Sequence, residues 1–313
     1  MKLSVIIPAH KAERTLPRTL ESVRAASEGL DVETVLVNDD EGRGLSWARN
    51  RGLDRATGDV VFFVDADDTV KRDYFRRHVA ALESSRADFV LSSFDMAPLK
   101  RDYNLVGNAA IREVMLPAFF GYDFEDVRRW NAGGALNARR ELGGVWRCAF
   151  RREFIERHRI RFDENLRLFE DSPFIAECAA RAERVASIPD VLYEYVPNPQ
   201  GLMMSSLGTD RYWNYKFAAL RNRKAIAARI GEDVLGRFGA SVVFSAIELF
   251  KARKGFRRYA EDPRGDVAGV LRLRFRGRAP LERRGRAERA ARARRGVAVR
   301  VSARVHCAAR NSV

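Results

Sequence analysis

The sequence is poor in cysteine and histidine, and neither type occurs with the spacing of a metal site. Its three cysteines, Cys148, Cys178 and Cys307, form an odd number without a Cys-x-x-Cys pair. This pattern argues against a disulfide framework and against a structural zinc site, and it fits a reducing compartment. The four histidines are scattered, which favours surface or packing roles for each of them: His10, His78, His158 and His306.

Long apolar runs are also missing. No segment approaches the ~20 apolar residues of a membrane span, and no basic and then apolar leader precedes the first apolar segment at Leu3. We therefore expect a cytoplasmic protein that is neither secreted nor membrane-spanning. With 313 residues, of which 46% are hydrophobic, the chain can bury one large core or a core with a smaller annex.

Acidic residues are scarce in one part of the chain only. The net charge is +15, but residues 271–313 hold 14 arginines against two glutamates, so this tail carries +12 and the rest of the chain +3. A basic tail can bind an anionic membrane surface or nucleic acid, or it can stay solvated, and composition leaves these alternatives open. Nucleic acid is the less favoured partner, because Phe275 is the tail's single aromatic residue and the remainder is nearly neutral.

The sequence does contain an apolar segment, typical of a strand, that is followed directly by a cluster of aspartates. Residues 60–64 are apolar throughout, as a central strand covered on both faces requires, and Asp65, Asp67 and Asp68 follow. Ligands bind at the carboxyl ends of such strands, and carboxylates suit Mg²⁺ or Mn²⁺. The alternative is that Asp67 and Asp68 cap a helix that begins near Val70. Three acids within four positions repel one another without a cation, which favours the metal site.

Strands alternate with helices over the first third of the chain. This alternation predicts an α/β fold with a doubly wound, mostly parallel sheet flanked by helices. Pro8 is expected to end the first strand, because it cannot donate to a ladder. The predicted elements are strands over residues 3–8, 32–37, 60–64 and 87–93, and helices over residues 12–26, 45–56 and 73–84.

The rest of the chain is less regular. Glycines break residues 95–144 into short pieces such as a helix over residues 111–120. Pro189-Asp190 is expected to turn between two short strands, and two amphipathic helices are expected to pack as an annex or to offer a dimer surface. These elements are the strands 185–188 and 191–195 and the helices 212–230 and 233–254. The predicted domains are a catalytic domain over 1–205, with a nucleotide half to 95 and an acceptor half from 96, a helical annex over 206–270 and the basic tail over 271–313.

A second acidic position, Asp171, follows Glu170 and precedes Pro173, where a helix is expected to begin. The residue types allow two roles for it. Asp171 or Ser172 caps the helix, or Asp171 acts as a general base at the helix N-terminus. The sequence by itself does not choose between these roles.

Six segments resemble the family 2 glycosyltransferases of GT-A fold, in particular bacterial enzymes that build capsule and lipopolysaccharide glycans. No segment is decisive alone, but all six occur in the family's order and together cover most of residues 3–205. The segments are Ser4-Val5-Ile6-Ile7-Pro8-Ala9-His10, Val37-Asn38-Asp39, Gly44-Leu45-Ser46-Trp47-Ala48-Arg49-Asn50-Arg51-Gly52, Val64-Asp65-Ala66-Asp67-Asp68, Arg161-Phe162-Asp163-Glu164 and Glu170-Asp171.

The resemblance implies an inverting transferase that moves a sugar from a nucleotide-diphosphate donor, with a UDP-sugar as the first choice. The acceptor would be a hydroxyl of a glycan or a lipid-linked glycan. On the nucleotide side, Pro8 and Ala9 correspond to the wall of the base pocket, and Asp39 to the acid that hydrogen-bonds uracil. Arg49 and Ala66 lie in matching segments and are also assigned to the nucleotide sugar.

On the reaction side, Asp65 and Asp67 correspond to the DxD pair of the family. The resemblance places Asp65 near the ribose and makes Asp67 the direct ligand of Mn²⁺ or Mg²⁺. Asp171 corresponds to the catalytic base of the Glu170-Asp171 motif. An inverting transfer needs one carboxylate to take the acceptor proton and a cation to neutralise the departing diphosphate, so the residues suit the chemistry. If the acceptor is lipid-linked, the basic tail would bring the enzyme to the inner face of the cell membrane.

The chain departs from the family pattern in two places. Only Asp40 to Arg43 separate the second and third matching segments, so one edge unit of the sheet is expected to be missing, and Asp40-Glu41 replace the customary Gly-Ser. After Tyr195 the chain lacks the Arg or His that relatives often place near the phosphates. We therefore expect the diphosphate to be held by the metal and by a loop over residues 201–206.

A nucleotidyltransferase is the competing enzyme class, and a nucleic-acid-binding protein is the competing non-enzyme class. Nucleotidyltransferases generally open with a Gly-rich phosphate loop after the first strand, and residues 8–12 contain no glycine. A nucleic-acid-binding protein is suggested by the arginine tail alone. The sequence names neither the transferred sugar nor the acceptor, and it leaves the oligomeric state open.

Overall fold

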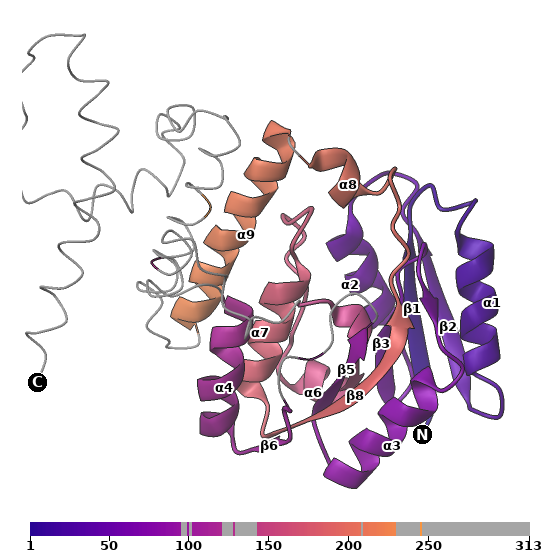
Figure 1. Cartoon of the computed structure of the whole chain (residues 1–313), viewed down its shortest axis with the longest axis vertical. Helices are drawn as coiled ribbons and strands as arrows, with labels where there is room; N and C mark the ends of the chain where they lie inside the picture. Colours follow the sequence, from indigo (N-terminus) through magenta and orange to yellow (C-terminus); the bar gives the residue numbers. More distant parts are fainter. Residues whose placement is uncertain are drawn as a thin grey trace, which may run out of the picture.

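One mixed sheet runs through the protein and carries helices on both faces (Figure 1). This computed structural model describes residues 1–94, 102–120, 143–207 and 209–229, together with Leu99, Arg128 and Ser245. Within these residues eight strands form one sheet in the order β2-β1-β3-β7-β5-β8-β4, with β6 paired to β8. The strands are β1 (Leu3–Ala9), β2 (Val32–Asn38), β3 (Val60–Phe63), β4 (Thr69–Val70), β5 (Phe89–Phe94), β6 (Leu105–Val106), β7 (Cys148–Arg151) and β8 (Arg184–Glu194).

The principal strands of the described sheet share one direction. β1 is parallel to β2 and to β3, and β5 is parallel to β8. The short strand β7 lies antiparallel between β3 and β5, so these two neighbours of β7 also run the same way. The mostly parallel α/β sheet that the sequence predicts is confirmed.

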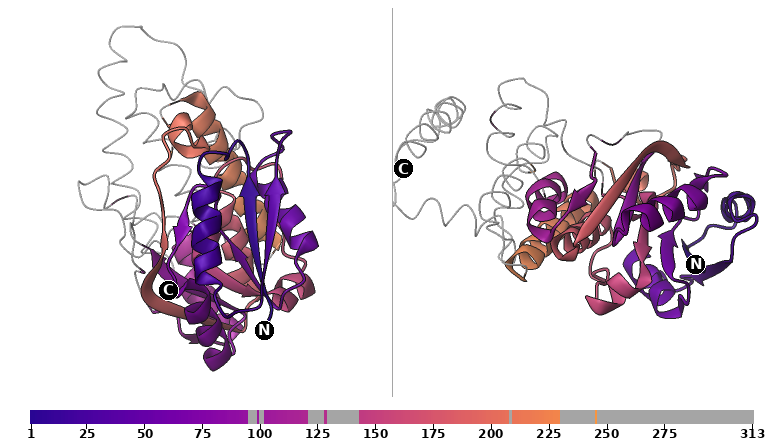
Figure 2. Two further views of the ribbon diagram at one scale, coloured as in Figure 1. Left: turned by 90° about the vertical axis from the view of Figure 1, so that its right-hand side faces the viewer. Right: turned by 90° about the horizontal axis from the view of Figure 1, so that it is seen from below.

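Residues of the central strand β3 alternate between two hydrophobic cores. Val61 and Phe63 pack with residues of α2, α4 and α7, whereas Val60 and Phe62 pack with residues of α1 and α3. Because both faces are covered, the strand is apolar at every position. Figure 2 shows from two further directions that helices lie on both sides of the sheet. The helices are α1 (Leu16–Ala26), α2 (Leu45–Arg55), α3 (Tyr74–Ser85), α4 (Asn108–Phe120), α6 (Arg152–Arg157), α7 (Asp171–Arg181), α8 (Leu202–Ser206) and α9 (Asp210–Arg229), with the 3-10 turn η1 (Val145–Arg147).

Strand β1 does not stop at Pro8, contrary to the expectation from the sequence, but continues to Ala9. The N–H of Asp39 donates to the carbonyl of Ala9 at 2.7 Å, so Ala9 bonds toward β2. Ile6 bonds toward β3, since its carbonyl accepts from the N–H of Val64 at 3.0 Å. The backbone of Pro8 faces the β3 side of the strand, as that of Ile6 does, but the pairing of β1 with β3 ends at Ile6. The missing N–H of the proline therefore falls where no ladder bond is needed.

Two strand predictions for the second half need correction. β7 is not predicted, because it has four residues and follows a glycine-rich segment. The two short strands expected on either side of Pro189-Asp190 are one strand, β8, and these two residues make no turn. The pairing of β8 with β5 shifts register after Ser92 and after Ser93, so irregular pairing accommodates the proline.

The sheet also bears on the expected organisation of the chain. It continues beyond residue 95, because β7 and β8 pair with β3 and β5. Strand β2 forms one end of the described sheet.

Part of the predicted annex can be compared with the structure. The helix predicted over residues 212–230 is α9, while the helix predicted over 233–254 and the tail over 271–313 lie outside the described residues. Over the described part of the chain, every helix is too short or too polar to cross a membrane.

Candidate active site

Helix α2 carries three polar residues, Ser46, Arg49 and Asn50, on one face. Their spacing of three and four positions places them side by side on a helix. The helix lies very close to the sheet, since a Cβ on Gly52 would come within 2.2 Å of a methyl carbon of Ile6. Glycine at this position thus sets the distance from which the polar face projects.

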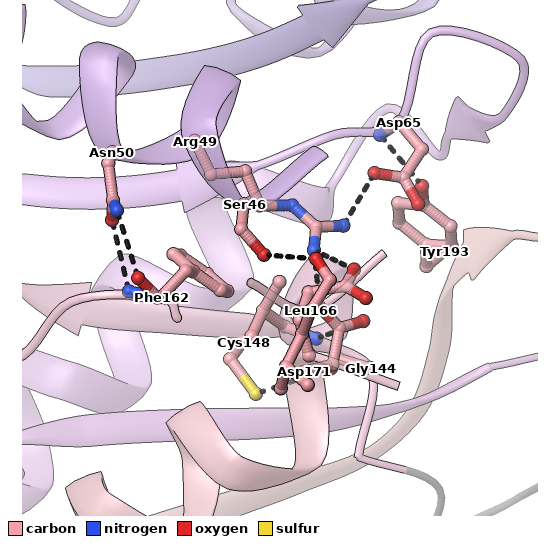
Figure 3. A network of polar contacts seen from close by, with 12 residues as sticks. Ser46, Arg49, Asn50, Asp65, Gly144, Cys148, Phe162, Leu166, Asp171 and Tyr193 are labelled. Carbon is pink, nitrogen blue, oxygen red and sulfur yellow. Dashed lines mark hydrogen bonds and ion pairs between the residues drawn. The ribbon is translucent and has the colours of Figure 1, made fainter. Parts of the chain in front are cut away.

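The polar face of α2 binds the segment before α7 (Figure 3). Ser46 Oγ donates to the carbonyl of Leu166 at 3.1 Å. Asn50 donates from Nδ2 to the carbonyl of Phe162 and accepts from its N–H, both at 3.0 Å. Because the side chain of Asn50 pairs with that backbone, α2 fixes residues 162–171, which include Glu170 and Asp171.

The guanidinium of Arg49 lies at the centre of the site and is 0% exposed. Its Nη2 donates to Asp65 at 2.8 Å, and its Nη1 donates to Glu170 at 2.7 Å and also to Asp171. Its carbon Cζ lies 5.3 Å from the ring centre of Phe162. Burial works against the charge, but the three carboxylates hold the pKa of Arg49 above its ordinary value. One cation therefore joins the acids after β3 to the acids before α7.

Asp171 is the first residue of α7 and not its cap. Glu170 takes the cap position, without a capping bond from its side chain. The carboxylate of Asp171 contacts Arg49 and the N–H of Val145, the latter at 3.4 Å. The helix-cap alternative for Asp171 is therefore wrong. Burial raises the pKa of Asp171 well above its ordinary value; Arg49 opposes this shift, and the charges of Glu170 and Asp65 reinforce it.

The acids after β3 lie in a tight turn, closed by a bond of 3.1 Å from the N–H of Asp68 to the carbonyl of Asp65. Strand β4 follows directly and pairs with β8, and α3 begins only at Tyr74. Asp67 and Asp68 therefore do not cap a helix near Val70. The side chain of Asp65 is 22% exposed, so its carboxylate meets both Arg49 and the surface.

Asp68 is buried, with 1% of the residue exposed, and was missed as a site residue. Its carboxylate accepts from Tyr193 Oη at 2.8 Å and from the N–H of Val196 at 2.7 Å. Tyr193 Oη in turn accepts from the N–H of Asp65 at 3.2 Å. Burial and the charge of Asp65 raise the pKa of Asp68 to about 8. No sequence pattern signals these contacts, which join positions 125 and 128 residues apart.

Asp67 points its carboxylate at the segment that follows β8. Asn198 Nδ2 donates to it at 2.8 Å, and Arg18 donates to its main-chain carbonyl at 2.6 Å. Burial raises the pKa of Asp67; the bond from Asn198 opposes this shift, and the charge of Asp65 supports it. A few residues later the chain forms α8, where the sequence suggested a loop over residues 201–206.

Asp39 is buried in the turn between β2 and α2. Its two oxygens accept from the N–H groups of Arg43 at 2.7 Å and Gly44 at 2.6 Å. Gly44 has a φ of +110°, a backbone conformation that favours glycine. Through its own N–H, Asp39 also binds Ala9, so the ends of β1 and β2 meet here.

The predicted site residues thus form two groups. Asp65, Glu170 and Asp171 meet at Arg49, whereas Pro8, Ala9 and Asp39 lie together at the ends of β1 and β2. Ala66 is buried in the acidic turn beside Asp67. Arg49, which the resemblance assigns to the nucleotide sugar, is enclosed, and its guanidinium binds three carboxylates.

The structure also places Trp146 and two of the histidines. Trp146 is a packing residue, since its ring stacks on Tyr193 with centroids 4.5 Å apart. His78 is buried between two main-chain carbonyls, and His10 is exposed. Trp130 and His306 lie outside the described residues.

The sequence profile of Glycosyl transferase family 2 matches residues 40–131, which begin next to Asp39 and include the acidic turn. The "Uncharacterized glycosyltransferase EpsJ" of Bacillus subtilis is 28% identical over 228 residues, covering 64% of this chain and 62% of that protein. The "Succinoglycan biosynthesis protein ExoO" of Rhizobium meliloti is 27% identical over 220 residues, covering 62% and 60%. In sequence, this chain resembles the family 2 glycosyltransferases.

The fold agrees with this resemblance. The crystal structure of S. aureus TarS 1-349 in complex with UDP-GlcNAc matches 82% of this chain and 77% of that chain, with a TM-score of 0.57 and 17% identity. This likeness shows a shared GT-A fold. The chain spans about three fifths of the length of each of these two curated relatives. These similarities favour a glycosyltransferase over the nucleotidyltransferase alternative.

Proposed function

We propose that the protein is an inverting glycosyltransferase that moves a sugar from a nucleotide-diphosphate donor, with a UDP-sugar as first choice, to a hydroxyl of a glycan or lipid-linked acceptor. One observation carries the proposal: Asp65, from the acidic turn, and Asp171, the first residue of α7, bind the same guanidinium. A donor-side acid and a base-side acid are thus held at one place. The ExoO relative, named for succinoglycan biosynthesis, supports a glycan as the product.

The proposed reaction is a single displacement. The carboxylate of Asp171 accepts the proton of the acceptor hydroxyl, while the hydroxyl oxygen forms a bond to the anomeric carbon of the donor sugar. The bond from that carbon to the diphosphate oxygen breaks, and its electron pair leaves with the nucleotide diphosphate. Burial keeps the pKa of Asp171 above that of a free aspartate, so this carboxylate is a stronger base than an exposed one.

The acidic turn suits a divalent cation. Burial of Asp67 and the neighbouring charge of Asp65 disfavour two bare carboxylates there, as the raised pKa of Asp67 indicates. The described residues hold no group of three His, Cys, Asp or Glu side chains arranged for a metal. Mg²⁺ in phosphate enzymes takes one or two carboxylates plus phosphate oxygens, so Asp67 with Asp65 is a sufficient protein contribution. Bound Mn²⁺ or Mg²⁺ would neutralise the leaving diphosphate.

The ends of β1 and β2 are proposed as the nucleotide pocket. Pro8 and Ala9 would supply its wall, Ala66 its floor beside the acidic turn, and Asp39 a carboxylate for the base. Both oxygens of Asp39 already accept main-chain N–H groups, so its carboxylate is held rigidly for such a contact. The basic tail is proposed to hold the enzyme at an anionic membrane surface when the acceptor is lipid-linked.

A donor panel tests this function. The purified chain is incubated with Mn²⁺ and each of several UDP- and GDP-sugars, and release of free nucleotide diphosphate is measured with and without oligosaccharide acceptors. We expect one donor to be turned over, with an acceptor-dependent increase. NMR of the product should show an anomeric configuration opposite to that of the donor.

Two results would speak against the proposal. Release of pyrophosphate in place of a nucleotide diphosphate would point to nucleotidyl transfer. A product that retains the donor configuration would exclude the single displacement and the role of Asp171 as its base.

A further inference from the structure

The orientation of Asp171 depends on Arg49 more than on any other described contact. The carboxylate has two described hydrogen-bond partners, the guanidinium of Arg49 and the N–H of Val145. The contact with Val145 measures 3.4 Å, which is longer than the usual N–H···O range of about 2.7–3.2 Å. Arg49 therefore makes the contact that determines where this carboxylate points.

Arg49 is itself held by contacts that do not involve Asp171. Its Nη2 donates to Asp65 at 2.8 Å, and its guanidinium lies over the ring of Phe162. The backbone of Phe162 is fixed in turn by paired hydrogen bonds with the side chain of Asn50, which lies next to Arg49 in α2. The plane of the guanidinium is thus set by the acidic turn and by α2, and Asp171 meets a donor group that is already in place.

We propose that Arg49 is a positioning residue, which holds the carboxylate of Asp171 toward the acceptor and ties that orientation to Asp65 on the donor side. The inference rests on the proposed function, because it takes Asp171 to be the base. It assigns to Arg49 a role other than donor binding. An enclosed side chain with three carboxylate partners acts on the reaction through them.

The variant Arg49→Lys tests this role, because lysine keeps the positive charge but cannot bridge three carboxylates with a planar fork. We expect kcat for transfer to fall by ~10², since a misplacement of about 1 Å has that effect on a rate. The KM for the donor and the metal-dependent affinity for the nucleotide diphosphate should stay near the wild-type values. A large rise in donor KM with normal kcat would show a donor-binding role and overturn the inference.

Arg151→Lys is the matched control. Arg151 lies on β7 and donates from Nε and Nη2 to the carbonyls of Ala87 at 2.8 Å and Leu82 at 2.9 Å, away from the acids. Its replacement also removes hydrogen bonds of a partly buried arginine, so it should lower stability with little effect on kcat. An equal fall of kcat in both variants would assign the effect of Arg49 to general destabilisation.

A double variant separates positioning from an independent contribution. If Arg49 acts through Asp171, then Arg49→Lys in an Asp171→Asn background should cause little further loss of kcat, because the group to be positioned is already disabled. Loss by the same factor in both backgrounds would overturn the inference. Millimolar guanidinium should also restore part of the kcat of Arg49→Ala but not that of Asp171→Asn, with urea as the control for denaturation.

The orientation itself can be observed without turnover. Crystal structures of the wild type and of Arg49→Lys should show the carboxylate of Asp171 rotated in the variant, with the fold and the acidic turn unchanged. An unmoved Asp171 would overturn the inference. This outcome differs from a failure of the proposed function, in which the wild type shows the contact with Arg49 but no donor of the panel is consumed.

Discussion

Tyr193 and Asp68 share a hydrogen bond of 2.8 Å that joins the end of β8 to the turn after β3. The same phenol oxygen accepts from the N–H of Asp65 at 3.2 Å. A single hydroxyl therefore fixes both ends of the turn. Of the two proposed metal ligands, Asp65 is itself held by this hydroxyl and Asp67 directly precedes Asp68 in the same turn.

The first prediction concerns this brace. Tyr193→Phe keeps the ring that stacks on Trp146 but leaves the buried Asp68 without one donor, so the free energy of unfolding should fall by about 1–3 kcal/mol. Metal-dependent binding of nucleotide diphosphate should weaken as well, because the turn loses its support. Denaturant unfolding and calorimetry measure the two effects. A stability loss with unchanged metal-dependent binding would mean that the brace does not shape the turn.

The second prediction concerns the metal. Asp67→Asn should abolish transfer and the metal-dependent part of nucleotide-diphosphate binding, since it removes the charge that a cation needs. Asp73→Asn is the control, because Asp73 precedes α3 without a side-chain capping bond. A chelator should stop the wild-type reaction, and added Mn²⁺ or Mg²⁺ should restore it. Undiminished turnover in the chelator would remove the basis for assigning Asp67 to a metal.

The third prediction concerns the base. Asp171→Asn should lower kcat by ~10² to 10⁴, the usual contribution of a positioned base, while donor affinity stays near normal. In the wild type, kcat should rise with pH as Asp171 loses its proton, with a midpoint above that of an ordinary aspartate, because burial raises its pKa. The acidic limb should vanish in the variant. A pH profile shared by both proteins would place the titrating group elsewhere.

The fourth prediction concerns acid stability. His78 is fully buried, and burial lowers its pKa to about 4; the carbonyls of Tyr74 and Arg147 oppose this shift, and the charge of Arg147 adds to it. The unfolded chain therefore binds more protons than the native state between pH 6.5 and about 4, and stability falls as pH falls through this window. Relative to His78→Gln, the wild type should lose roughly 3 kcal/mol across it. Unfolding free energies of both proteins that change in parallel over this range would contradict the shift.

The fifth prediction concerns the basic tail. Each arginine near an anionic surface contributes about 1 kcal/mol, so the full chain should sediment with anionic vesicles but not with neutral ones. Salt should release it, because it screens the attraction. Truncation after Val270 should end vesicle binding and spare activity on a soluble acceptor. Equal recovery of full-length and truncated protein in the pellet would favour a tail that is only solvated.

Much of the fold could be predicted because its signals are local. The continuous apolar run over residues 60–64 predicted a strand with two covered faces, and helical spacing predicted α9 close to its observed bounds. Strand β7 could not be predicted, because four residues after a glycine-rich segment carry little pattern. Pro189 misled the prediction for β8, since irregular pairing with β5 accommodates a proline that usually breaks a strand.

The candidate site was predictable in its acids but not in its connections. Asp65, Asp67 and Asp171 follow from strand ends and motifs. The spacing of Ser46, Arg49 and Asn50 could have indicated one polar helix face, yet nothing in the sequence tells which segment this face binds. That information resides in tertiary contacts, which bring Arg49 together with Asp65, Glu170 and Asp171.

The contacts between α2 and the segment before α7 also determine when the site can form. Ser46 and Leu166 are 120 residues apart in the chain, and Arg49 and Asp171 are 122 apart. Closing so long a loop costs entropy, and contacts at large sequence separation form slowly. A ribosome must therefore synthesise the chain as far as Asp171 before Arg49 can meet it, and a shorter nascent chain that already holds the acidic turn lacks this contact. The contact between Arg49 and Asp171 thus forms only after the segments that carry these two residues have folded together.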